Sequence, residues 1–130
     1  MISFDEMGDW LDEIAEQFPP EFYNELNGGI LLLPEARFDP QFPPGEMYIL
    51  GEYCYDDLGR YINLYYGSFA ALFSELDDDE LYDELYNTLS HEFTHHLESL
   101  AGERGLEIKD EIELEQYRAD LAGREGPQEG

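Results

Sequence analysis

The longest hydrophobic pattern in the chain lies between residues 80 and 100, where apolar side chains recur at every third or fourth position. This spacing places them on one stripe of an α-helix, and the stripe must face a core. Its members are Leu81, Leu85, Leu89, Phe93, Leu97 and Leu100. The aspartates at 77–79 favour a helix start just before the stripe. The pattern therefore predicts a helix over about 80–100, with Gly102 and Gly105 bounding its exit.

Three further helices are predicted from local signals. Ser3 and Glu6 have the spacing of a capping box, and apolar residues follow at helical intervals as far as Phe18, where a Pro-Pro pair ends the pattern. A short helix is expected over 21–26, before an Asn-Gly-Gly stop signal. A last helix is expected over about 109–121.

The middle of the chain alternates between apolar runs and turn residues. The run 30–33 predicts a buried strand, and the segment 34–46, which holds four prolines, predicts a surface loop. The runs 47–55 and 61–66 flank a turn sequence and predict an antiparallel hairpin. The segment after Gly67 fits a helical turn or a loop equally well. These patterns predict an α+β fold, in which a small, mainly antiparallel sheet packs on the long helix between N- and C-terminal helices.

Composition adds strong acidity to this picture. At 130 residues, with 42% hydrophobic and 15% aromatic content, the sequence predicts one folded domain spanning 1–130. Its 32 acidic residues against six basic ones give a formal net charge of −26. This charge repels nucleic acids and anionic membrane surfaces. Solubility or salt adaptation is the simplest reading of the charge, and a basic substrate or partner is the alternative.

Location follows from what the sequence lacks. Cys54 is the only cysteine, so no internal disulfide can form. The N-terminus shows no signal-peptide pattern, and no segment approaches the roughly 20 apolar residues of a membrane span. We expect a cytoplasmic protein that does not contact membranes. The sequence does not indicate an oligomeric state.

All three histidines lie in one stretch of the long helix, HEFTHHLES, residues 91–99. His91 and His95 are one helical turn apart and off the apolar stripe, so both imidazoles can reach one metal ion. Glu92 stands where a metallohydrolase places its general base. This HExxH arrangement predicts one Zn²⁺ per chain, against the alternative of a solvated face with chance histidines. His96 points about 100° away from His95, so we expect it to pack rather than to bind metal.

The residues leave the third metal ligand open. Glu98 lies on the same face as the histidines, but about 10 Å along the helix axis from His91, which strains direct coordination. A contact through water, or through another ligand, fits Glu98 better. The segment beyond the helix offers further carboxylates, namely Glu107, Asp110, Glu111, Glu113 and Glu115.

In these features the chain resembles the minimal zincin-like metallopeptidases of bacteria. The stretch LSHEFTHHLE resembles their active-site helix, SFDEMGDWLDEIAEQFPPEF their N-terminal helix, and LGEYCYDDLGRYINLYYGSF their hairpin. In the family, the helix is followed by a glycine and then by an acidic pair. Here Glu98 replaces the glycine, and SLAGERGLE separates the helix from IKDE. Matching IKDE to the acidic pair makes Asp110 the expected third ligand and Glu98 the second choice. A thermolysin-like site would instead use Glu111 or Glu115.

The resemblance implies a zincin-like fold and a zinc-dependent peptidase. In this reading His91, His95 and Asp110 hold the zinc, and Glu92 activates water against a peptide or protein substrate, with basic segments favoured. An exposed sheet edge would bind the substrate by strand addition. Two alternatives remain: a non-catalytic acidic binding protein, and a metal-binding pseudoenzyme with structural zinc. Tyr66 and Tyr117 are candidate oxyanion donors, although packing is the favoured role for both.

Overall fold

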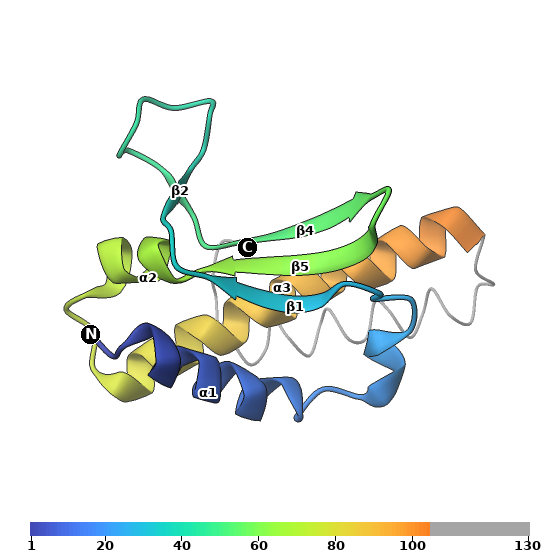
Figure 1. The fold of residues 1–130 in the computed structure, drawn as a ribbon, viewed down its shortest axis with the longest axis horizontal. Coiled ribbons are helices and arrows are strands. Elements are labelled where there is room, and N and C mark those ends of the chain that lie inside the picture. Colours follow the sequence, from blue (N-terminus) through green and yellow to red (C-terminus); the bar gives the residue numbers. More distant parts are fainter. Residues whose placement is uncertain (105–130) are drawn as a thin grey trace, which may run out of the picture.

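Three strands and one long helix form the frame of residues 1–104, the part of the chain that this computed structural model describes (Figure 1). The elements in chain order are α1 (Phe4–Ala15), the 3₁₀ turn η1 (Pro20–Tyr23), β1 (Gly29–Leu33), β2 (Arg37–Phe38), β3 (Tyr48–Ile49), β4 (Gly51–Asp56), β5 (Gly59–Tyr65), α2 (Tyr66–Phe73) and α3 (Asp78–Arg104). The α+β prediction is confirmed. Within residues 1–104, no helix is long and apolar enough to cross a membrane.

The main sheet has the strand order β1-β5-β4. Strands β4 and β5 form the predicted antiparallel hairpin, whose last pair is Asp56 with Gly59. Strand β1 pairs with β5 in parallel, from Gly29 opposite Tyr61 to Leu33 opposite Tyr65. The sheet is therefore mixed, and the prediction of a mainly antiparallel sheet was wrong. Turn residues encode the direction of a hairpin, but no local signal encodes how a distant strand such as β1 joins it.

A two-stranded arm projects from one end of this sheet (Figure 1). Its strands β2 and β3 pair Arg37 with Ile49 and Phe38 with Tyr48. The expected loop 34–46 thus contains a short strand, and Tyr48–Ile49 belongs to the arm instead of extending β4. Two-residue strands are too short to show alternation in a sequence.

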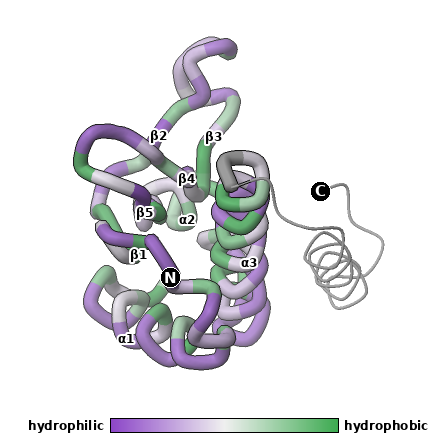
Figure 2. The backbone as a smooth tube through the Cα atoms, turned by 90° about the vertical axis from the view of Figure 1, so that its right-hand side faces the viewer, coloured by the Kyte–Doolittle hydropathy of each residue, from purple (hydrophilic) through white to green (hydrophobic). Residues whose placement is uncertain are grey.

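Helices α1 and α3 bury one face of the main sheet (Figure 2). Along β5, Ile62 and Leu64 point into this core, while Tyr61 and Asn63 point to the other face. The predicted stripe of α3 supplies Leu81, Leu85, Leu89 and Phe93 to the core. Helix α1 begins with the predicted capping box, because Ser3 Oγ accepts from the Glu6 N–H and Glu6 accepts from the Ser3 N–H.

Helix α3 begins one turn earlier than its apolar stripe. The Asp77 carboxylate accepts from the Glu80 N–H at 2.8 Å, and Glu80 accepts from the Asp77 N–H at 3.2 Å, a reciprocal cap. The helix continues through Gly102 to Arg104, past the expected end near Leu100 and up to Gly105, the second of the two glycines expected to bound its exit. A glycine weakens a helix by only about 1 kcal/mol, which flanking turns can offset.

The structure also assigns two short segments. The segment expected to be a helix over 21–26 contains instead the 3₁₀ turn η1. The segment after Gly67, for which a helical turn and a loop fitted equally well, belongs to the helix α2. The helix expected over 109–121 lies outside the described residues.

Candidate metal and catalytic site

The two histidines of the motif converge on the exposed side of α3. His91 and His95 pack edge to face, with ring centroids 4.5 Å apart, and their Nε2 atoms lie 3.0 Å from each other. The core contacts of Leu89 and Phe93 fix the rotation of the helix, because both side chains are fully buried. The predicted geometry of the pair is thus present.

This spacing fits a shared metal ion. Zinc binds imidazole nitrogens at about 2.0–2.1 Å with tetrahedral angles, which places two such nitrogens about 3.3 Å apart. The observed 3.0 Å separation of the Nε2 atoms is close to that value. Burial, and then the neighbouring His95, lower the pKa of His91, which favours the neutral imidazole that metals bind. Within residues 1–104, no group of three His, Cys, Asp or Glu side chains is arranged to hold a metal.

Glu98 lies beside the histidine pair. Its Oε1 atom is 3.8 Å from Nδ1 of His95, the ring nitrogen that does not face His91. At this distance the carboxylate lies beyond hydrogen-bond length but close to the second nitrogen of His95, the nitrogen through which carboxylates orient metal-binding imidazoles. The indirect role of Glu98 stays a prediction. Asp110, the expected third ligand, and the alternatives Glu111 and Glu115 lie outside the described residues.

Glu92 turns away from solvent, toward the sheet. Its side chain is only 5% exposed, and its carboxylate accepts a hydrogen bond from the Tyr53 N–H of strand β4. Burial raises the pKa of Glu92 to about 7, the charge of Glu52 adds to the rise, and the Tyr53 N–H opposes it. A carboxyl group with a pKa near neutrality can both accept and return a proton at physiological pH.

The contact between Glu92 and Tyr53 also locates the open edge of the sheet. The Tyr53 N–H faces α3 and therefore points away from β5, on the unpaired side of β4. Backbone groups alternate in direction along a strand, so the next outward-facing residues are Gly51 and Tyr55. Within residues 1–104, no strand pairs with this edge of β4, which runs along α3 past Thr88 and Glu92.

His96 has a different environment from its two neighbours on the motif. It is fully buried, its Nε2 donates to the Asn24 carbonyl at 2.9 Å, and its Nδ1 accepts from the Tyr53 hydroxyl at 2.9 Å. Burial lowers the pKa of His96, the Asn24 hydrogen bond opposes this shift, and Arg60 adds to it. The expected packing role of His96 is confirmed.

Arg60 completes this buried network. Only 3% exposed, it donates to the Tyr53 hydroxyl at 3.0 Å and to the Ser99 hydroxyl, and its guanidinium lies 3.9 Å from the centre of the Tyr55 ring. The network ties β4 and β5 to α3 at the level of the motif. Sequence reasoning missed Arg60 and Tyr53, although a basic residue inside a strand of so acidic a chain is a signal that could have identified Arg60.

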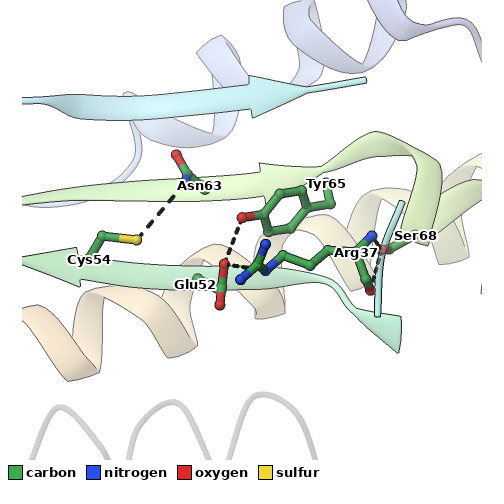
Figure 3. Close-up of polar contacts among 6 residues, drawn as sticks. All are labelled: Arg37, Glu52, Cys54, Asn63, Tyr65 and Ser68. Atoms are coloured by element: carbon green, nitrogen blue, oxygen red, sulfur yellow. Dashed lines mark hydrogen bonds and ion pairs between the residues drawn. The ribbon is translucent and has the colours of Figure 1, made fainter. Parts of the chain in front are cut away.

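A second polar cluster lies on the opposite face of the sheet (Figure 3). Glu52 Oε1 accepts from the Tyr65 hydroxyl at 2.6 Å and pairs with Arg37 Nε at 2.9 Å. Burial and the bond to Glu52 raise the pKa of Tyr65 to about 12, so its hydroxyl stays protonated as a donor. Farther along, the Asn63 amide contacts Cys54 Sγ at 3.9 Å. Cys54 is a free cysteine and is only partly buried.

The tyrosine candidates for an oxyanion donor do not reach the site within the described residues. The Tyr66 hydroxyl donates to the Ile2 carbonyl, and its ring packs edge-on against Phe4. Tyr66 is therefore a packing residue, as favoured. Tyr117 lies outside the described residues.

Comparisons with known proteins give a relative among the solved structures. No family model matches the chain, and no curated protein matches it. Among solved structures, a conserved hypothetical protein from Thermo thermophilus is 34% identical, with a TM-score of 0.69, over 78% of this chain and 99% of the other. Identity and coverage at this level show common ancestry across the whole of that protein. The chain belongs to the family of this conserved hypothetical protein.

Proposed function

We propose that the protein is a zinc-dependent peptidase with a zincin-like fold. One observation carries the proposal: two imidazoles with Nε2 atoms 3.0 Å apart stand next to a buried glutamate whose pKa is about 7. A structural zinc site has no need of such a glutamate, because it uses four protein ligands and leaves no place for water. The resemblance of HEFTHH to the active-site helix of zincin-like metallopeptidases points the same way.

The residues of α3 divide the chemistry between them. His91 and His95 would hold the metal, together with a third ligand for which Asp110 is the first choice. The zinc supplies a Lewis acid and lowers the pKa of bound water. Glu92 would act as general base toward water and return the proton to the leaving amine. Its hydrogen bond to the Tyr53 N–H holds the carboxylate at the edge of β4.

The substrate in this proposal is an extended peptide that pairs with the open edge of β4. Strand addition uses the outward-facing backbone groups beside Tyr53 and needs no deep pocket. The net charge of −26 favours a peptide with basic segments at long range.

Metal content and hydrolysis of the purified protein test the proposal. We expect about one zinc per chain by elemental analysis, lost in His91→Ala and in Asp110→Ala. His91 is exposed, so its replacement leaves the core intact. Glu92→Gln should keep the zinc and abolish the hydrolysis of a mixed peptide library, followed by mass spectrometry.

Controls separate the parts of this test. Asp83→Asn removes a charge from an exposed position of α3 and should change neither readout. If Asp110→Ala keeps its zinc, the same measurement on Glu98→Ala, Glu111→Ala and Glu115→Ala identifies the third ligand. A wild-type protein that takes up no zinc, or unchanged turnover in Glu92→Gln, would refute the peptidase assignment.

A further inference from the structure

The structure contains one exposed cation near the site that the proposed chemistry does not use. Of the six basic residues in the chain, Arg37 and Arg60 are those whose side chains the structure describes. Arg60 is buried in the Tyr53 network, whereas the Arg37 side chain is 50% exposed. In a chain with 32 acidic residues, an exposed arginine that is held in one position is unusual, and ligand binding is a role that would account for it.

Arg37 is held at both ends. Its backbone N–H donates to the Ser68 hydroxyl at 2.9 Å, and that hydroxyl, fully buried, approaches the Arg37 carbonyl at 3.4 Å. Its Nε pairs with Glu52, which the buried Tyr65 hydroxyl fixes in turn (Figure 3). A guanidinium carries several further N–H donors, so a half-exposed side chain anchored through Nε can still bind a ligand. This preorganisation reduces the entropy lost on binding.

The position of Arg37 places it at the peptide edge of the site. Its partner Glu52 immediately precedes Tyr53, the residue whose N–H meets the Glu92 carboxylate. The charge of Glu52 contributes to the raised pKa of Glu92. A strand advances about 3.3 Å per residue, so Glu52, the partner of Arg37, lies about one residue from Tyr53 along β4, with its side chain on the opposite face of the sheet.

The direction of the strands decides which end of a peptide reaches Arg37. Strand β4 and helix α3 run the same way, because a side chain at Gly51 would meet Thr88, while Tyr53 meets Glu92 and His96. Arg37 therefore lies toward the N-terminal end of β4 from the motif. A peptide that pairs antiparallel with β4 directs its C-terminal part there, and a cation attracts a carboxylate and repels an N-terminal ammonium group.

We infer that Arg37, positioned by Glu52 and Tyr65, binds a carboxylate of the substrate, and that this carboxylate is the C-terminus of a peptide cut close to its end. The inference rests on the proposed function, because it names the substrate class of the same site. Planar pairing of guanidinium with carboxylate is among the strongest polar contacts in proteins. The acidic surface repels carboxylates elsewhere, so Arg37 gives them one place to bind.

Matched peptides test the inference on the zinc-loaded protein. Each peptide is prepared with a free C-terminal carboxylate and as the C-terminal amide, and kcat/KM is measured for both. We expect the free acid to be cut at least about tenfold faster, within two or three residues of its end. Arg37→Gln should remove the preference by slowing cleavage of the free acid to about the rate on the amide, and Arg37→Lys should retain only part of it.

A charge-matched control and a second carboxylate source sharpen the result. Gln41→Glu lowers the net charge by one on the same arm, as Arg37→Gln does, and should keep the preference. Amidated peptides that end in aspartate present the carboxylate on a side chain instead. If they match the free acid and depend on Arg37, the carboxylate site stands and its ligand is an acidic side chain. Equal rates for acid and amide in the wild type, or a preference that persists in Arg37→Gln, would overturn the inference.

Failure of the peptidase proposal has a different signature. In that case neither peptide form is cut, and the Arg37 site is judged by binding of N-acetyl-dipeptide acids and amides to the Glu92→Gln protein, followed by NMR. Tighter binding of the acid by about tenfold, lost on adding Arg37→Gln, supports the carboxylate site without hydrolysis. Equal binding of acid and amide overturns it.

Discussion

The raised pKa of Glu92, which suits a general base, also makes the stability of the fold depend on pH. Its pKa is raised from 4.5 to about 7, so below pH 4.5 the carboxyl is protonated in the folded and unfolded states alike and folding loses nothing. As the pH rises toward 7, the unfolded state ionises first, and stability falls by about 3 kcal/mol once both states are ionised. The metal-free Glu92→Gln protein should therefore match wild type near pH 5 within about 1 kcal/mol and exceed it by about 2–3 kcal/mol at pH 8.

Urea unfolding in the presence of a chelator measures this difference. Asp83→Asn is the control, because it removes the same charge from an exposed position of α3. It should show no comparable gain between the two pH values. If the stability difference between Glu92→Gln and wild type is the same at pH 5 and pH 8, then ionising Glu92 does not destabilise the folded protein, and the raised pKa is refuted.

The motif residues differ in how far their sequence predicted them. Helical angles alone place His91 and His95 together and turn His96 away, because all three lie on one regular helix. The burial of Glu92 could not be predicted, since it depends on the edge of β4 meeting α3 from a distant part of the chain. The roles of Tyr53 and Arg60 depend on the same contact. The sequence therefore predicts the relative positions of residues on one helix, but not the contacts that this helix makes with distant segments.

The same division holds for whole elements. Helices α1 and α3 and the β4–β5 hairpin carry their own caps, stripes and turn, and all were predicted. The parallel placement of β1, and the arm made by β2 and β3, rest on contacts between distant segments. One such contact is very close: the Gly67 N–H of α2 donates to the Glu35 carbonyl at 3.1 Å, at the base of the arm.

Gly67 allows a test of that element contact. A Cβ atom at this position would lie 2.4 Å from the backbone nitrogen of Ala36, where no flexible side chain can move aside. Gly67→Ala should lower the free energy of unfolding by about 2–3 kcal/mol or more. The matched control is Gly8→Ala in α1, where nothing lies within 4 Å; it should raise stability by about 0.5–1 kcal/mol. Equal effects of the two substitutions on urea midpoints would argue against the close packing of α2 on the arm.

At the scale of the whole molecule, fold and charge oppose each other. Ring contacts among Phe18, Phe22 and Phe93 pack the segment after α1 and the turn η1 against α3. The net charge of −26 pushes the same surface apart, since like charges repel more strongly in the compact state than in the unfolded chain. The exposed Arg37 is a local exception to this field, and the proposed preference for basic substrates would be its long-range effect.

Screening should therefore stabilise this protein. The Debye length falls from about 30 Å at 0.01 M salt to about 3 Å at 1 M, so added NaCl removes most of the repulsion between surface carboxylates. We expect stability to rise by about 1–2 kcal/mol, or roughly 4–8 °C in Tm, with most of the gain below about 0.5 M. Calorimetry in NaCl and KCl at equal ionic strength distinguishes screening from solvent effects on apolar burial, which would instead grow steadily into the molar range. A Tm that does not depend on salt below 0.5 M would show that the carboxylates are too far apart to oppose folding, and the acidity would then have to be explained by binding alone.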